Sequence, residues 1–226
     1  SHQTRWLGDY DLSDYPGDVY EDGVAGIIAT IRESSEPVTV VAIGPVPNLA
    51  EALRRAPDIV ENARFVGMHG AIRMGYGGSP TVVPEANVRC DPGALKAVLA
   101  ATWECTLTPL DTCGLVRLMG DRYQRVAACD TPAIHMLMEN YRMWHPPWLK
   151  GQAPDCRTTS SVLFDTVAVY LAFSEDLVQM EELCLRVTDD GLTVPDPAGP
   201  RIRCATSWLN LDAFLDLLVA RLVAGR

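Results

Sequence analysis

A short run of β-branched and small residues, residues 38–43, constrains the fold of this chain more than any other feature of its sequence. The run is too short for a helix, and it lacks the alternation of polar and apolar residues that a half-exposed strand shows. Continuous runs of this kind are typical of parallel strands that are covered on both faces. Gly44 and Pro45 end the run, and Asn48 is placed to cap a following helix. We therefore expect a strand, a tight turn and a helix, which together form half of a βαβ unit.

Patterns on either side of this run extend the prediction to an open α/β fold. Apolar residues recur at helical intervals in residues 21–34, and short apolar segments at residues 64–68 and 104–107 are expected to form strands. Near the C-terminus, alternating segments around turns at residues 189–191 and 197–199 predict a small antiparallel hairpin region. The fold class predicted is an open, mostly parallel sheet flanked by helices.

The composition excludes some classes of partner. The chain has 226 residues, a net charge of −10 and a sequence pI near 4.8, whereas proteins that bind nucleic acids or anionic membranes present basic surfaces. Its seven cysteines are scattered, without a Cys-x-x-Cys pair, which is typical of reduced cytoplasmic proteins. No apolar run reaches the roughly 18 residues of a membrane span, and no signal peptide is recognisable. We expect a cytoplasmic protein that binds neither nucleic acid nor membranes.

Candidate site residues follow the predicted strands, because open α/β sheets bind ligands outside the carboxyl ends of their strands. Ile43 ends the first strand, and residues 69–80 after the second contain four glycines and one proline, whose backbone can fold over a ligand. Glu85 and Asn87 share a face if their segment is extended, where they would bind hydroxyl groups or act as turn residues. Asp111, after the third strand, is placed to cap a helix or brace the rim of a site.

Asp165 stands out because it begins an otherwise apolar segment, residues 165–171. Burying an unpaired carboxylate is costly, so this side chain requires a cation, a capping role or a hydrogen-bond donor. The sequence pattern does not choose among the three.

These segments, in their order and spacing, resemble the inosine-uridine-preferring nucleoside hydrolases. The motifs that carry the resemblance are Val41-Ala42-Ile43-Gly44-Pro45 with Asn48-Leu49-Ala50, Met68-x-Gly70, Glu85-x-Asn87 with Asp91-Pro92, and Asp165 opening a helix. The resemblance extends from about residue 20 to the C-terminus. It implies a single α/β domain over residues 1–226 that is similar to the C-terminal two-thirds of a nucleoside hydrolase.

The resemblance also implies an activity, which is hydrolysis of the N-glycosidic bond of ribonucleosides to ribose and free base, in nucleoside salvage. It implies one bound calcium ion, a substrate water activated by that ion, and assembly into a homodimer or homotetramer. By position, Asp165 matches a calcium carboxylate and Ile43 matches the residue whose carbonyl binds the metal. Met68, Glu85 and Asn87 match residues that line the ribose pocket. Oxygen donors of this kind suit calcium, which takes six to eight of them.

The chain departs from the family pattern in one segment. The resemblance implies an aspartate-rich first strand of the form Asp-x-Asp-x-Gly-x-Asp-Asp, which supplies most calcium ligands and the catalytic base, and this motif is absent from the sequence. We therefore expect that these 226 residues are part of a longer protein, and the base stays unassigned.

A second departure concerns the acid that protonates the leaving base. Many relatives carry a histidine before the metal aspartate, whereas this chain has Phe164, which cannot donate a proton. His69 lies on the candidate site loop and is a weak candidate for the acid, since a histidine there could titrate near neutrality. Trp208 is placed to stack on a base, although a position in the core explains it equally well.

Three functions compete at this level. The leading one is a calcium-dependent nucleoside hydrolase, and the second is a catalytically silent protein that binds a nucleoside or ribose-like ligand. The third is an α/β domain in which Glu85, Asn87 and Asp165 have only structural roles. It predicts no effect of calcium on thermal stability, whereas a metal that binds the native state raises stability by mass action.

Overall fold

The computed structural model describes residues 6–144 and 155–224. The chain divides into two compact units, which are described separately. The helical unit comprises Ser1–Val19, Arg117–Val162 and Leu211–Arg226, and the sheet unit comprises Tyr20–Val116 and Leu163–Asn210. That the chain forms a single domain stays a prediction.

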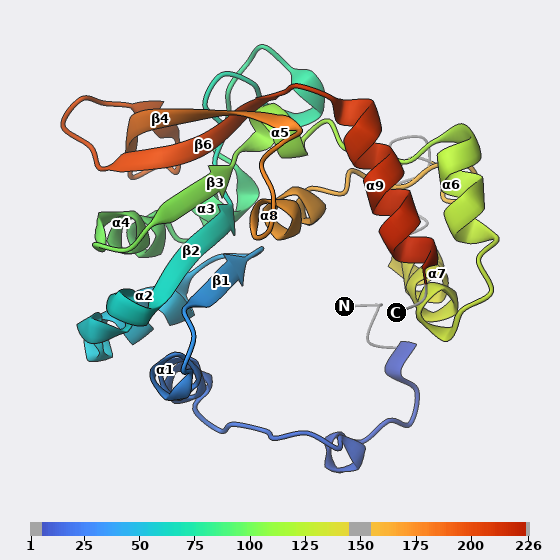
Figure 1. Ribbon diagram of the computed structural model, residues 1–226, viewed down its shortest axis with the longest axis horizontal. Helices are drawn as coiled ribbons and strands as arrows, with labels where there is room; N and C mark the ends of the chain where they lie inside the picture. The colour runs from blue at the N-terminus through green and yellow to red at the C-terminus, as the bar shows by residue number, and fades with distance from the viewer. Residues whose placement is uncertain (1–5, 145–154, 225–226) are drawn as a thin grey trace. The chain divides into compact units, whose positions relative to one another are not determined.

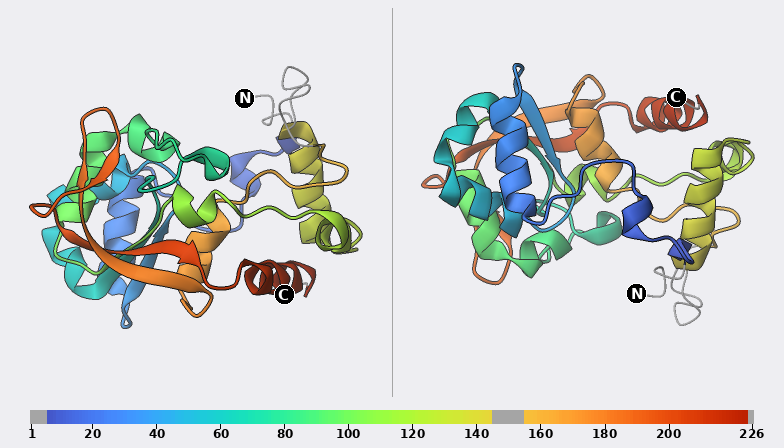
Figure 2. Two further views of the ribbon diagram at one scale, coloured as in Figure 1. Left: turned by 90° about the horizontal axis from the view of Figure 1, so that it is seen from above. Right: turned by 90° about the horizontal axis from the view of Figure 1, so that it is seen from below.

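The sheet unit contains a six-stranded sheet in the order β1-β2-β3-β6-β4-β5 (Figure 1). Its strands are β1 (Val38–Ala42), β2 (Ala63–Met68), β3 (Cys105–Thr108), β4 (Val178–Val187), β5 (Thr193–Pro195) and β6 (Arg201–Trp208). Neighbouring strands from β1 to β6 are parallel, whereas β4 is antiparallel to both β6 and β5. The long β4 and β6 lie side by side as a ribbon (Figure 2). The prediction of a mostly parallel sheet with an antiparallel region near the C-terminus is confirmed.

Helices cover both faces of this sheet (Figure 1). On one face, α1 (Gly23–Glu33), α2 (Pro47–Arg55) and α4 (Pro92–Ala100) pack through a core that includes Leu49, Phe65, Leu95, Leu107 and Ile202. On the other face, α8 (Asp165–Leu171) packs against β1, β2 and β3. The remaining elements of this unit are α3 (Ala86–Cys90), α5 (Leu110–Cys113) and the 3₁₀ turns η3 (Pro57–Asn62) and η4 (Tyr76–Gly78).

Two helix starts follow from local capping chemistry. The Asp22 carboxylate accepts hydrogen bonds from the backbone N–H groups of Val24 (3.0 Å) and Ala25 (3.1 Å), and the Asp91 carboxylate accepts one from Ala94 (2.9 Å). The start of α2 differs from the prediction. Pro47 occupies its first turn, so Asn48 lies inside the helix and does not cap it.

The first strand is the main correction to the predicted fold. Its continuous apolar pattern predicts burial on both faces, yet Val38–Val41 are half-buried and only Ala42 is buried. The reason is the strand order, since β1 is the end strand and pairs with β2 alone among the described strands. The prediction of full burial is wrong because sequence periodicity does not contain the order of strands in a sheet.

Among the described residues, the helical unit contains η2 (Leu12–Asp14), α6 (Gly120–Ala127), α7 (Pro132–Trp144) and α9 (Leu211–Val223). The Arg122 guanidinium on α6 forms ion pairs with Asp212 and Asp216 on α9, each at 2.7 Å. In the described ranges, no helix has the length and apolar character to cross a membrane.

Candidate functional site

A cavity of about 230 Å³ lies at the carboxyl ends of β1 and β2. Ile43 follows β1, Met68 ends β2, and Phe164 and Asp165 lie at the start of α8. The full lining is Ile43, Met68, Tyr76, Glu85, Ala86, Asn87, Phe164 and Asp165. All the residues predicted for the site line this cavity except His69, Asp111 and Trp208. The cavity is at the sheet edge where open α/β folds bind ligands.

Glu85 is a buried helix cap that also contacts the loop after β2. Its side chain is 3% exposed. One carboxylate oxygen accepts a hydrogen bond from Asn87 N–H (2.9 Å), and the other accepts from Val88 N–H (3.2 Å) and Gly70 N–H (3.3 Å). Burial raises the pKa of Glu85, and the backbone N–H groups oppose this rise. Glu85 and Asn87 therefore meet at the cavity through a helix start, and not through the extended segment that was predicted.

Asn87 links α3 to the end of β2. Its amide nitrogen donates a hydrogen bond to the Met68 carbonyl (3.0 Å) and contacts the Met68 sulfur (3.4 Å). Within the described ranges, the Asn87 Oδ1 atom has no hydrogen-bond partner. This oxygen is therefore available to accept a hydrogen bond from a ligand in the cavity.

Tyr76 is a lining residue that the sequence analysis missed. Its hydroxyl oxygen accepts a hydrogen bond from Ala86 N–H (2.8 Å), and its ring meets that of Phe164 edge to face at 6.0 Å between centroids. Burial raises the pKa of Tyr76, so the hydroxyl keeps its proton at neutral pH. An aromatic residue inside the glycine-rich segment 69–80 was the one signal that could have drawn attention to it.

Asp165 lines the cavity without a hydrogen-bond or ion-pair partner among the described residues. It is the first residue of α8, and burial raises its pKa. The carboxylate does not cap its own helix, because no side-chain cap is formed at this start. The sequence left three explanations for this carboxylate, which were a cation, a capping role and a hydrogen-bond donor. Within the described residues, Asp165 neither caps a helix nor meets a donor.

The donors at this cavity do not complete a calcium site. Calcium takes six to eight oxygen ligands, whereas the donors expected here are the Asp165 carboxylate and the Ile43 carbonyl. Within residues 6–144 and 155–224, no group of three or more His, Cys, Asp or Glu side chains is placed to hold a metal ion. The oxygen chemistry suits a hard cation, but these residues alone are too few to hold one.

His69 and Trp208 lie outside the lining of the cavity. His69 is fully buried, its Nε2 atom lies 2.9 Å from the Gly44 carbonyl oxygen, and burial lowers its pKa to about 4. It therefore does not titrate near neutrality as the sequence analysis expected. The Trp208 indole donates a hydrogen bond to the Thr112 carbonyl (3.0 Å). The catalytic role suggested for His69 and the stacking role suggested for Trp208 stay predictions.

The comparison with protein families identifies the family. The model of the inosine-uridine preferring nucleoside hydrolase family matches residues 2–216. The chain belongs to this family. Nucleoside hydrolases are generally metal-dependent.

The chain is also similar to individual proteins. A pyrimidine-specific ribonucleoside hydrolase of Shewanella oneidensis is 26% identical over 86% of this chain and 62% of its own length. An uncharacterised protein of Schizosaccharomyces pombe is 28% identical over 85% of this chain and 58% of its own length. The chain thus spans about three-fifths of each of these two relatives.

Solved nucleoside hydrolases share the fold. The crystal structure of an inosine-uridine preferring nucleoside hydrolase from Bacillus anthracis has a TM-score of 0.68 and 25% identity, covering 88% of this chain and 64% of that one. A purine-preferring ribonucleoside hydrolase from Gardnerella vaginalis has a TM-score of 0.76 at 21% identity, covering 96% and 71%. Both comparisons support the α/β fold with a mostly parallel sheet.

Proposed function

We propose that this protein hydrolyses the N-glycosidic bond of ribonucleosides, releasing ribose and a free base. The observation that carries the proposal is Asp165, a half-buried carboxylate without a partner in the described residues, in the same cavity as Glu85 and Asn87. Leaving a carboxylate in this state costs folding energy. A site that binds a cation or a polar ligand explains this cost, and membership of a hydrolase family supports the same conclusion.

The lining divides into two chemical parts under this proposal. Met68, Glu85 and Asn87 hold the ribose, with the free Asn87 Oδ1 accepting a hydroxyl hydrogen bond. Asp165 and the Ile43 carbonyl would contribute oxygen ligands to a metal, which we take to be calcium because both donors are oxygens. The further ligands that calcium needs would have to come from other groups. A water attacks the anomeric carbon through a transition state with oxocarbenium character.

The leaving base requires a proton donor, and Phe164 cannot supply one. The Tyr76 hydroxyl lies in the same lining, accepts a hydrogen bond from Ala86 and donates one to no described residue. We therefore take Tyr76 as the candidate donor to the base. Tyr76→Phe is expected to slow hydrolysis of nucleosides with poor leaving groups more than that of nitrophenyl riboside, whose leaving group needs no proton. Equal slowing of both substrates would contradict this role.

One observation favours a second function, which is nucleoside or ribose binding without cleavage. Of the two carboxylates in the lining, Glu85 is occupied by three backbone N–H groups, so Asp165 alone is free. Hydrolysis needs a base for the water as well as metal ligands. If no further carboxylate reaches the cavity in the whole protein, a binding role is expected.

The deciding experiment measures release of free base from inosine, uridine and cytidine, with calcium and with a chelator. The product of the complete gene and the 226-residue chain are assayed side by side. Calcium-dependent release by the former supports the proposal. Absence of release by both, with ribose binding retained in calorimetry, supports the binding protein. If neither form of the protein releases base or binds ribose, both proposed functions are overturned.

A cytoplasmic location and assembly into homodimers or homotetramers are further parts of the proposal. Light scattering of the same samples tests the assembly.

A further inference from the structure

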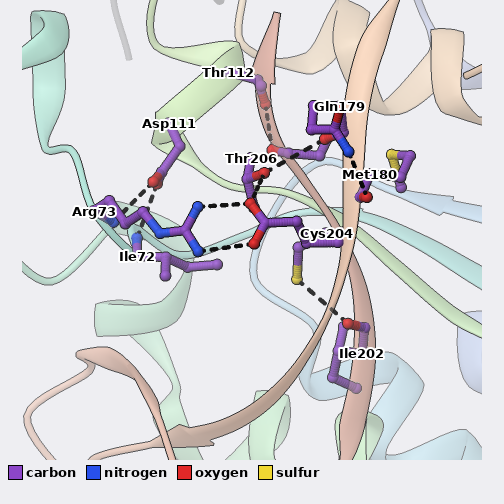
Figure 3. Close-up of polar contacts among 11 residues, drawn as sticks. Ile72, Arg73, Asp111, Thr112, Gln179, Met180, Ile202, Cys204 and Thr206 are labelled. Carbon is purple, nitrogen blue, oxygen red and sulfur yellow. Dashed lines mark hydrogen bonds and ion pairs between the residues drawn. The ribbon is translucent and has the colours of Figure 1, made fainter. Parts of the chain in front are cut away.

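Asp111 is a buried carboxylate that binds the backbone of the loop after β2. It lies on α5, directly after β3, and is 1% exposed. One carboxylate oxygen accepts a hydrogen bond from Ile72 N–H (2.9 Å), and the other accepts one from Arg73 N–H (2.8 Å) (Figure 3). Both oxygens are therefore used on two consecutive backbone groups, and hydrogen bonds to a charged group are stronger than neutral ones.

The loop that Asp111 holds joins two lining residues of the candidate site. Met68 at its start and Tyr76 at its end both line the cavity. The neighbouring Leu110 N–H donates a hydrogen bond to the Gly70 carbonyl (2.9 Å), so α5 binds the loop at three backbone positions. Gly70 N–H in turn donates to the Glu85 carboxylate. A continuous set of hydrogen bonds thus runs from α5 through the loop to the cavity.

Gly70 shows how closely this loop is packed. Its φ of +85° lies in the left-handed region, and a Cβ atom there would come within 2.6 Å of the Thr193 hydroxyl. A side chain at this position would strain the backbone and collide with Thr193, so the path of the loop at this point depends on glycine.

A second contact holds the same loop, but through a side chain. The Arg73 guanidinium donates two hydrogen bonds to the Glu181 carboxylate on β4 (2.6 and 2.9 Å), and the Thr206 hydroxyl donates to the same carboxylate (Figure 3). Arg73 and Thr206 hold the pKa of Glu181 down to about 2. The Arg73 and Glu181 side chains are 54% and 34% exposed, and exposed ion pairs contribute little to stability. Two carboxylates from other elements thus bind this loop, the buried Asp111 and the partly exposed Glu181.

We propose that Asp111 is a positioning residue for this cavity, which fixes the loop between Met68 and Tyr76 without touching the substrate. The inference rests on the proposed function, because it assigns Asp111 to the same site. Preorganised walls matter for catalysis, since a displacement of about 1 Å costs as much as 100-fold in rate.

The test compares two carboxylate-to-amide changes in whichever form of the protein is active. Asp111→Asn keeps one acceptor but turns an N–H₂ group toward the other backbone N–H, whereas Glu181→Gln alters the partly exposed contacts with Arg73 and Thr206 and leaves the loop backbone bonds intact. We expect Asp111→Asn to lower kcat/KM by about 10- to 100-fold and Glu181→Gln by less than about fivefold. Hydrogen exchange at the Ile72 and Arg73 amides should accelerate in Asp111→Asn and stay unchanged in Glu181→Gln.

Each outcome decides the inference. A folded Asp111→Asn protein with unchanged kcat and KM, or with unchanged amide exchange, would overturn it, because a purely structural residue lowers only the melting temperature. If Asp111→Asn does not fold, Asp111→Ser replaces it, because the shorter side chain removes the carboxylate from both amides without adding an N–H₂ donor, and the same loss of kcat/KM and faster amide exchange are expected. If the wild type neither releases base nor binds ribose, the proposed function fails, and amide exchange alone then decides whether Asp111 fixes the loop.

Discussion

The two strand ends that line the cavity are held in different ways. The loop after β2 is bound through its backbone by Leu110 and Asp111, through Gly70 by Glu85, and through the Arg73 side chain by Glu181. In the turn after β1, Ile43 is 49% exposed and Gly44 accepts a hydrogen bond from His69. The first strand itself is the half-buried end strand of the sheet. One wall of the cavity is therefore fixed by many contacts and the other by few.

This difference separates two kinds of residue in the candidate site. Residues on the β2 side, such as Glu85 and Asn87, are already hydrogen-bonded and suit the recognition of a fixed shape such as a ribose ring. Asp165 on α8 carries a carboxylate without a partner in the described residues, and Ile43 is half exposed. The β2 side is thus held largely by hydrogen bonds within the chain, whereas on the side of β1 and α8 the Asp165 carboxylate has no partner among the described residues.

The largest expected effect tests this division at Asp165. Asp165→Ala should lower kcat/KM of the active form by more than about 100-fold, as loss of a metal ligand or substrate contact does. Its melting temperature should stay unchanged or rise, because the change removes a carboxylate that is desolvated without compensation. Enzyme kinetics and thermal unfolding measure the two quantities.

The matched control is Asp121→Ala, since Asp121 is an exposed acidic residue in the first turn of α6. It should leave kcat/KM within about twofold, as surface substitutions do. A loss of stability without a loss of activity in Asp165→Ala would show that Asp165 has a structural role, and the contrast between the two walls would then be wrong.

A smaller effect is expected at His69, which links the two strand ends through Gly44. Because burial lowers its pKa to about 4 from an ordinary value near 6.5, the unfolded state binds its proton more readily than the native state. The free energy of unfolding should therefore fall as the pH falls from 6.5 to 4, by roughly 3 kcal/mol from this residue. Above pH 6.5 the imidazole is neutral in both states and contributes no pH dependence.

His69→Gln tests this, because glutamine can still donate a hydrogen bond to Gly44 but does not titrate. Urea unfolding from pH 7 to pH 4 should show a shallower loss of stability in the variant than in the wild type. The carboxylates that ion pairs hold at low pKa, such as Glu51 and Glu181, are common to both proteins and cancel in the difference. Equal slopes would show that His69 is accessible to protons in the native state.

The sequence predicts those features that depend on neighbouring residues in the chain. Helix caps such as Asp22 and Asp91 are local features of this kind, because the N–H groups that they bind lie two or three residues away. The helix start at Glu85 was not foreseen, because this cap also contacts Gly70, fifteen residues away. His69 lies on the correct loop but is buried, which depends on the packing of Phe65 and the Gly44 turn.

Pattern and family motifs together predicted part of the lining. Ile43 and Asp165 follow from both and Met68 from the motifs alone, and the three come together from distant parts of the chain. Tyr76 escaped both approaches. Its place depends on the fold of a glycine-rich loop, and its hydroxyl is positioned by Ala86, ten residues further along. Residues whose position depends on such long-range contacts cannot be found from spacing, whereas residues that directly follow a strand can.

A last comparison makes the same side-chain truncation on the two walls, and its smaller effect is expected at Ile43. Ile43→Ala should lower the free energy of unfolding by less than about 1 kcal/mol, because the side chain is already 49% exposed. Ile72→Ala on the loop after β2 should cost about 2 to 4 kcal/mol, because Ile72 is 8% exposed and the change leaves a void. Denaturant unfolding of both variants measures the difference.

Ile43→Ala should also leave kcat/KM nearly unchanged, because the proposed metal ligand is its backbone carbonyl. A cost at Ile43 that equals the cost at Ile72 would mean that the wall formed by β1 is packed against further structure, and the contrast between the two strand ends would no longer hold.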